Sequence, residues 1–226
     1  MHSLFSPFSV RKSRTVSPRS KKGIHSIRRE LIVNPIRAKK KPQSFFELLQ
    51  DSPVIAAVKS EDGLEKALTC ECAAVFILNS TILNVTNMVQ QVKASGKLAF
   101  VHADLVDGLA ARDIAADFLT QATQADGIIS TRPNLIRRAK ELDLITIQRF
   151  FLLDSLAFDS VLRQSSNADI IDILPGTMPR VIERLTKLVH QPVIASGLLV
   201  DKQDVMGALS AGALAVSTTC EPLWFA

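Results

Sequence analysis

The chain has 226 residues, of which 47% are hydrophobic and 22% charged, so we expect one globular domain with a sizeable core. No apolar run approaches the roughly 20 residues that a membrane-spanning helix needs, which excludes a membrane-spanning protein. The three cysteines form neither a CxxC pair nor a disulfide framework, so we expect a reducing compartment and predict no metal site at Cys70 and Cys72.

The positive charge is concentrated at the amino terminus. Residues 1–44 contain 12 Lys and Arg but a single acid, Glu30, and carry +11, whereas residues 45–226 carry −6. This segment has too few apolar residues to offset the entropy of ordering it, so we expect a disordered basic extension. Three interpretations stay open for it: a nucleic-acid-binding arm, an organellar transit peptide, or an upstream extension without a role.

From residue 53 onward, short runs rich in β-branched residues alternate with helical patterns. Eight such runs are predicted to be strands: 53–58, 73–78, 97–102, 126–130, 144–149, 169–174, 192–196 and 213–218. Their near-continuous hydrophobicity is typical of parallel strands buried on both faces.

The segments between these runs carry apolar residues at helical spacing, most clearly over 114–122, and each predicts a helix with one buried stripe. Pro133 and Pro179 suit the first turn of a helix. Thr177 and Asp201 are predicted to cap the amino termini of the helices that follow them.

Together these elements predict a compact α/β fold, a (β/α)8 TIM barrel over residues 45–226, preceded by the extension of residues 1–44. An open doubly wound sheet is the rival, but it usually has a glycine-rich turn after its first strand, and Gly63 stands too late and alone. The chain is short for such a barrel, so we expect abbreviated helices after the second and eighth strands.

Small polar residues end the seventh and eighth predicted strands. In such barrels the carboxyl ends of the strands form the ligand face, and the last two loops commonly hold a phosphate with backbone N–H groups. Gly197 lets the backbone approach an anion, and hydroxyl groups add donors. We therefore predict a phosphate site at Ser196, Gly197, Ser217 and Thr218; the alternative is that these residues only turn corners and cap a helix.

The other strand ends carry a mixed polar set that suits the hydroxyl groups of a small polyol. The predicted rim residues are Lys59, His102, Asp104, Gln148, Arg149 and Asp172. Lys59 or Arg149 can balance the charge of a phosphate. The same set is compatible with acid–base chemistry, because His102 beside Asp104 is a plausible proton relay. No standard catalytic or nucleotide-binding motif is present.

Several long motifs carry a resemblance to a known family. They are VHADLVDGLAARDIAADF, DGIISTRPNLIRRAKEL, TIQRFFLLDS, DIIDILPGTMP and VIASGLLVDKQDVMGALSAGALAVSTT. Over about residues 51–225 the chain resembles the glycerol uptake operon antiterminator regulatory proteins, the GlpP family. At the positions of Ser196 and Cys220 the family more usually has Gly and Asn, so the fold is better predicted than the affinity for ligand.

The resemblance implies a cytoplasmic regulator rather than an enzyme. Such a protein binds glycerol 3-phosphate as its effector, needs no other cofactor, and acts on the leader of the glycerol uptake mRNA so that transcription continues past a terminator. Two alternatives stay open: a phosphosugar or phosphopolyol enzyme on the same barrel, and a phospho-ligand sensor that acts on another protein. No oligomeric state is predicted.

RNA contact has weaker support from the residues themselves. The predicted barrel is acidic, and the sequence has no tyrosine, one tryptophan and no motif for stacking bases. The densest basic cluster of the predicted barrel lies on or beside the polar face of the fourth predicted helix, at Arg132, Arg137, Arg138 and Lys140. We predict RNA contact there; the alternative is an ordinary solvated helix face.

Overall fold

The computed structural model describes residues 42–110 and 112–225. The predictions made for residues 1–41 lie outside the described residues. The first described helix, α1 (Pro42–Asp51), begins three residues before the predicted domain boundary at residue 45.

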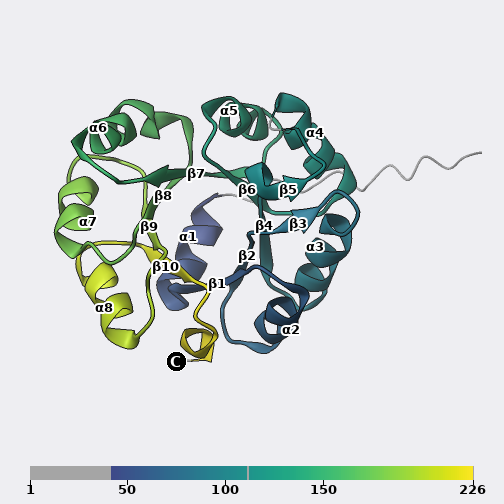
Figure 1. Ribbon diagram of the computed structural model, residues 1–226, viewed down its shortest axis with the longest axis horizontal. Helices are drawn as coiled ribbons and strands as arrows, with labels where there is room; N and C mark the ends of the chain where they lie inside the picture. The colour runs from purple at the N-terminus through teal and green to yellow at the C-terminus, as the bar shows by residue number, and fades with distance from the viewer. Residues whose placement is uncertain (1–41, 111, 226) are drawn as a thin grey trace, which may run out of the picture. The chain divides into compact units, whose positions relative to one another are not determined.

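Eight parallel strands close into a barrel in the order β1-β10-β9-β8-β7-β6-β4-β2 (Figure 1). They are β1 (Val54–Val58), β2 (Ala74–Ile77), β4 (Leu98–His102), β6 (Gly127–Ser130), β7 (Ile145–Phe151), β8 (Ile170–Leu174), β9 (Val193–Ser196) and β10 (Ala215–Thr218). All eight predicted strands are confirmed. The pairing of β1 with β10, with Ile55 opposite Ser217, closes the barrel and rules out the open sheet.

In the described part of the chain, seven helices surround the barrel. They are α2 (Glu61–Thr69), α3 (Val85–Ala94), α4 (Asp113–Ala122), α5 (Pro133–Glu141), α6 (Ser155–Gln164), α7 (Pro179–Thr186) and α8 (Lys202–Ser210). After β10 the chain forms only the 3-10 helix η3 (Glu221–Phe225), as predicted. The predicted abbreviation after the second strand is wrong, because α3 has ten residues and buries Val85, Met88, Val89 and Val92 along one stripe.

The predicted helix starts are mostly confirmed. Pro133 and Pro179 are the first residues of α5 and α7, and the Asp201 side chain accepts a hydrogen bond from the Asp204 amide at the start of α8. Thr177 is not a cap. The residue before α7 is Met178, which makes no side-chain capping bond.

Helix α1 was not predicted, and it fills the amino-terminal end of the barrel. Phe45 and Leu49 are buried in one cluster with the residues that begin the strands, such as Ala74 and Ala215. The Phe45 ring lies 4.8 Å from the Phe100 ring, centroid to centroid. Figure 1 shows α1 crossing the space enclosed by the strands.

Side chains alternate between the barrel interior and the surrounding helices, because successive strand residues point to opposite faces. The interior is a buried apolar cluster that includes Phe100, Ile147, Ile170, Ile194 and Ala215. Two positions further along the same strands, and therefore also inside, lie His102, Arg149, Asp172, Ser196 and Ser217. The carboxyl-terminal end of the interior is thus a polar layer above an apolar one.

Three short elements that the sequence did not indicate line the mouth beside β2 and β4. They are β3 (Ser80–Thr81), the 3-10 helix η1 (Ala103–Leu105) and β5 (Val106–Asp107). β3 and β5 pair in parallel as a separate two-stranded sheet. A further 3-10 turn, η2 (Ser165–Asn167), follows α6. Within residues 42–110 and 112–225, no helix is long and apolar enough to cross a membrane.

Candidate ligand site at the mouth of the barrel

A buried ion pair occupies the polar layer inside the barrel. Arg149 and Asp172 are register partners on β7 and β8, and Arg149 Nε lies 2.6 Å from Asp172 Oδ2. The second carboxylate oxygen, Oδ1, accepts a hydrogen bond from Ser196 Oγ on β9. The Asp172 side chain is fully buried and Arg149 nearly so. The carboxylate therefore fixes both the guanidinium and the hydroxyl in position.

The guanidinium group of Arg149 has N–H donors that are not used in the ion pair. Its Nε atom alone is engaged with Asp172, and neither terminal nitrogen makes a hydrogen bond with any residue in the described part of the chain. A guanidinium fork matches the geometry of a phosphate or carboxylate. Arg149 is thus a fixed cation that is able to bind an anion entering the barrel.

His102 lies in the same layer and is 4% exposed. Burial, together with the charge of Arg149, lowers the pKa of its imidazole to about 4, although Asp104 acts in the opposite direction. The imidazole is therefore neutral near pH 7, and it can accept one hydrogen bond and donate another. Its Nδ1 atom is buried without a hydrogen-bond partner among the described residues, so one polar atom in this layer is unsatisfied.

The predicted relay between His102 and Asp104 is not formed. Both oxygens of the Asp104 carboxylate are directed at the β6–α5 loop: Oδ1 accepts from Ser130 Oγ at 2.6 Å, and Oδ2 accepts from the Thr131 amide at 2.7 Å. Asp104 therefore holds the loop that follows β6.

Three of the four predicted phosphate-site residues come together at the ends of β9 and β10. Ser196 and Ser217 are register partners on these adjacent strands, and Gly197 follows Ser196 directly. The Ser217 hydroxyl makes no hydrogen bond with the residues that the structure describes, whereas that of Ser196 is held by Asp172.

The loop after β9 has a backbone shape that suits an anion. Gly197 (φ 75°) and Leu198 (φ 61°) both adopt left-handed conformations, and in the described chain their amides donate to no acceptor. A Cβ atom at Gly197 would lie 3.2 Å from Leu174 Cδ2, so a side chain there is crowded as well as strained. Consecutive free amides in such a turn form a concavity that binds anions.

Two predicted residues do not join this layer. Thr218 and Gln148 each lie next to an inward-facing strand residue, and their side chains therefore point outward, toward the helices. The Thr218 hydroxyl donates to the Leu199 carbonyl at 2.8 Å, and Gln148 Nε2 lies 3.4 Å from Gln164 Oε1 on α6. Lys59 has the interior phase, two residues after Ala57, and is exposed at the rim.

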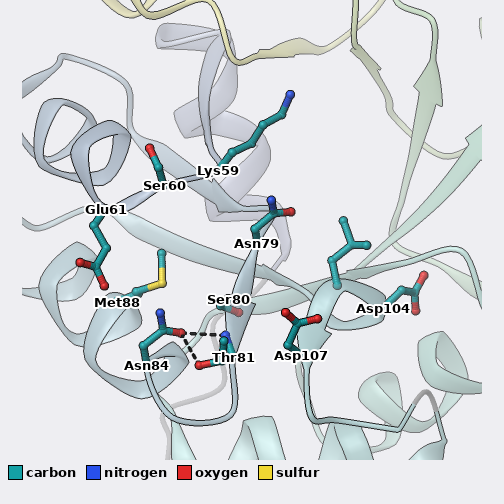
Figure 2. Close-up of a pocket in the computed structure, with 11 residues that line it drawn as sticks. Lys59, Ser60, Glu61, Asn79, Ser80, Thr81, Asn84, Met88, Asp104 and Asp107 are labelled. Atoms are coloured by element: carbon teal, nitrogen blue, oxygen red, sulfur yellow. Dashed lines mark hydrogen bonds between the residues drawn. The ribbon is translucent and has the colours of Figure 1, made fainter.

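A polar pocket of about 390 Å³ opens on the β1, β2 and β4 side of the mouth (Figure 2). Two predicted residues, Lys59 and Asp104, line it. Asn79, the residue after the second predicted strand and so expected on the ligand face, also lines it. The remaining lining residues were missed: Ser60, Glu61, Ser80, Thr81, Asn84, Met88, Leu105 and Asp107. Most of them belong to β3, β5 and the adjoining turns, whose two-residue strands leave no periodic signal in the sequence.

The predicted basic cluster on α5 divides into two parts. Arg138 pairs with Asp117 at 2.5 Å, Lys140 with Asp169 at 3.3 Å, and Arg137 lies 3.9 Å from Asp113. These three cations are thus matched by carboxylates within the barrel's own surface. Arg132, immediately before the first turn of α5, has no ion-pair partner among the described residues.

Residues 54–224 match the model of a family described as glycerol-3-phosphate responsive antiterminator. The chain is 40% identical over 181 residues to the uncharacterized protein YgcP of Escherichia coli K12. This match covers 79% of this chain and 95% of YgcP.

Two solved structures of glycerol uptake operon antiterminator proteins are also similar to this chain. The glycerol uptake operon antiterminator regulatory protein of Listeria monocytogenes is 35% identical with a TM-score of 0.72, and the match covers 76% of this chain and 94% of that one. A glycerol uptake operon antiterminator-related protein of Thermotoga maritima is 32% identical with a TM-score of 0.68, covering 76% and 98%. The deoxyribose phosphate aldolase of Aeropyrum pernix is 14% identical with a TM-score of 0.57, covering 81% and 96%, and shares the fold alone.

Proposed function

The chain belongs to the glycerol-3-phosphate responsive antiterminator family, and we propose that it binds glycerol 3-phosphate in the mouth of its barrel. We further propose that the bound form acts in the cytoplasm on the leader mRNA of genes for glycerol uptake and use, so that transcription passes a terminator. The observation that carries the ligand proposal is the buried, fixed Arg149 with two free guanidinium nitrogens in the polar layer.

The phosphate end of the ligand fits the sector between β7 and β10. Arg149 supplies the charge, the amides of Gly197 and Leu198 supply uncharged donors, and the Ser217 hydroxyl adds another. Asp172 orients the guanidinium group of Arg149 through one nitrogen, Nε. The two terminal nitrogens stay available to the phosphate. Bidentate contacts between a guanidinium and a phosphate are among the strongest hydrogen bonds in proteins.

The glycerol end has donors and acceptors on the other side of the mouth. His102, neutral near pH 7, has an unsatisfied Nδ1 atom, and the pocket beside it holds Lys59 and Asp104. Hydroxyl groups of a polyol both donate and accept, and so satisfy such a mixed set. The enzymatic alternative has less support, because the hydrogen bond that a His102–Asp104 relay requires is replaced by bonds from Asp104 to Ser130 and Thr131.

A response requires the ligand to bind one state of the protein more tightly than another. The loop after β9 is suited to such a change, since its two left-handed residues have free amides that an anion would engage. We therefore expect glycerol 3-phosphate to order this loop and to raise the affinity for the leader mRNA.

Two titrations test the proposal. Calorimetry with glycerol 3-phosphate, glycerol and inorganic phosphate should give the tightest binding for the first, because only that ligand satisfies both ends of the site. Filter binding of a glycerol-uptake leader transcript should strengthen when glycerol 3-phosphate is saturating. RNA affinity that is unchanged by saturating ligand contradicts the regulatory proposal, and consumption of the ester in an NMR time course supports the enzyme instead.

A further inference from the structure

Five exposed cations at the carboxyl-terminal face of the barrel have side chains without an ion pair or hydrogen bond in the described chain. They are Lys59, Arg112, Arg132, Arg180 and Lys202. Cations on the flanks of the helices differ, since Lys66, Arg138 and Lys187 each pair with a carboxylate.

Four of these cations occupy electrostatically unfavourable places. Arg112 and Arg132 immediately precede α4 and α5, and Arg180 and Lys202 lie in the first turns of α7 and α8. The amino terminus of a helix carries partial positive charge, so a cation there is destabilised and an anion favoured. Arg163, which also has no partner among described residues, lies in the last turn of α6, where the dipole favours a cation.

Three carboxylates beside the starts of α6 and α8 are engaged with the backbone. Asp154 accepts a hydrogen bond from the Ala157 amide, Asp201 from the Asp204 amide, and Asp204 from the Val200 amide. These bonds direct carboxylate oxygens toward the helix starts. The cations between them are left to face solvent.

Exposed apolar side chains lie between these cations. Phe151, the last residue of β7, is 54% exposed, and Leu153, between β7 and α6, is 85% exposed. Leu198, between β9 and α8, is 71% exposed. Helices α4, α5, α6, α7 and α8 follow one another around the barrel (Figure 1). From Arg132 onward, unpaired cations and exposed apolar groups therefore alternate along one arc of the mouth: Arg132, Phe151 and Leu153, Arg180, Leu198, Lys202. Arg112 extends the arc at its α4 end.

We propose that this arc, from Arg112 to Lys202, is the docking surface for a single-stranded segment of RNA laid across the mouth of the ligand site. Single strands present phosphates and unstacked bases in alternation, and proteins bind them with cations that follow the backbone and aromatic or apolar groups that contact bases. The proposal rests on the proposed function and gives it a surface. It also moves the RNA contact away from Arg137, Arg138 and Lys140, whose charges are already paired.

Two matched charge variants of the full chain test the surface. Arg132→Gln with Arg180→Gln removes two arc cations, and Arg137→Gln with Lys140→Gln removes two paired cations from α5. Binding of a leader transcript, at saturating glycerol 3-phosphate, is measured against salt concentration. The arc variant should bind about tenfold more weakly and lower the slope of log K against log salt by about 1.4, since each lost phosphate contact on a single strand contributes about 0.7. The α5 variant should leave both unchanged.

A second pair tests the apolar part of the arc. Leu153→Ala should weaken RNA binding at high salt, where charge contacts are screened, whereas Leu188→Ala, an exposed leucine just after α7, should not. Calorimetry with glycerol 3-phosphate shows whether each variant is folded and keeps its effector site.

The outcomes are separable. Wild-type RNA affinity in the arc variant overturns the docking surface, as does a loss confined to the α5 variant. An arc variant that binds RNA normally but fails to support antitermination with purified polymerase would assign the arc to a protein partner and overturn the RNA proposal. A wild-type chain that binds no leader RNA with or without ligand refutes the proposed function itself, and the docking surface with it.

Discussion

Arg149 and Asp172 face each other from adjacent strands inside the barrel, with Nε and Oδ2 2.6 Å apart and both side chains buried. Removing one partner of a buried ion pair leaves an uncompensated charge, which costs about 3–5 kcal/mol. Replacing both with apolar residues is far less costly. The pair therefore allows stability and binding to be separated experimentally.

Arg149→Met should abolish binding of glycerol 3-phosphate and lower the free energy of unfolding by about 3 kcal/mol, because Asp172 loses its partner. Arg149→Met combined with Asp172→Leu should recover most of the stability but none of the binding. Urea denaturation and calorimetry on both variants measure the two effects. Ligand binding in the double variant at wild-type affinity would show that Arg149 does not hold the phosphate.

Stability should depend on pH through His102. Its pKa is lowered from 6.5 to about 4 in the folded protein, so between these values the unfolded chain binds more protons than the folded one. The free energy of unfolding should therefore fall as the pH drops from 6.5 toward 4, by up to about 3 kcal/mol. His102→Asn should remove this part of the pH dependence, and His190→Asn, an exposed control, should retain it.

Gly197→Asp should abolish binding of glycerol 3-phosphate, because it places a carboxylate beside the proposed phosphate position. Gly96→Asp is the matched control: Gly96 also has a positive φ, of 81°, but lies at the end of α3, where an added Cβ would meet no atom within 4 Å. Both variants should lose about 1–2 kcal/mol of stability from the left-handed conformation, and Gly197→Asp should lose more, because its Cβ would also crowd Leu174. Calorimetry showing equal ligand affinity in the two would mean that the phosphate lies elsewhere.

Phe45→Ala should destabilise the barrel by about 3–5 kcal/mol, since Phe45 is 1% exposed and packs on Phe100. Phe46→Ala, at the partly buried neighbouring position, should cost less. Thermal and urea unfolding compare the two. Equal stabilities would show that α1 contributes little to the core.

The sequence was sufficient for the strands because each is a separate apolar run, and their number and spacing predict closure. It was less informative at the mouth. Adjacent polar residues such as Gln148 and Arg149 were grouped together, although a period of two places one outside and one inside the barrel. That separation depends on knowing which residues line the interior.

Tertiary contacts account for the other differences. The basic cluster on α5 is matched by acids from α4 and from the start of β8, partners that lie 20 or more residues away in the chain for Arg138 and Lys140. No local pattern reveals such pairing. The two-residue strands β3 and β5 are too short for any periodic signal, yet they form a wall of the pocket.

Helix α1, at the amino-terminal end of the barrel, has a consequence for the rate at which a ligand leaves. Because Phe45 and Leu49 of α1 fill the amino-terminal end of the barrel, a small molecule held at the polar layer would reach solvent past the loops that follow the strands. An RNA strand bound across those loops, as proposed above, would cover this route. The residence time of the effector would then be set by the lifetime of the whole assembly, and a brief rise in metabolite could persist as a longer-lived signal.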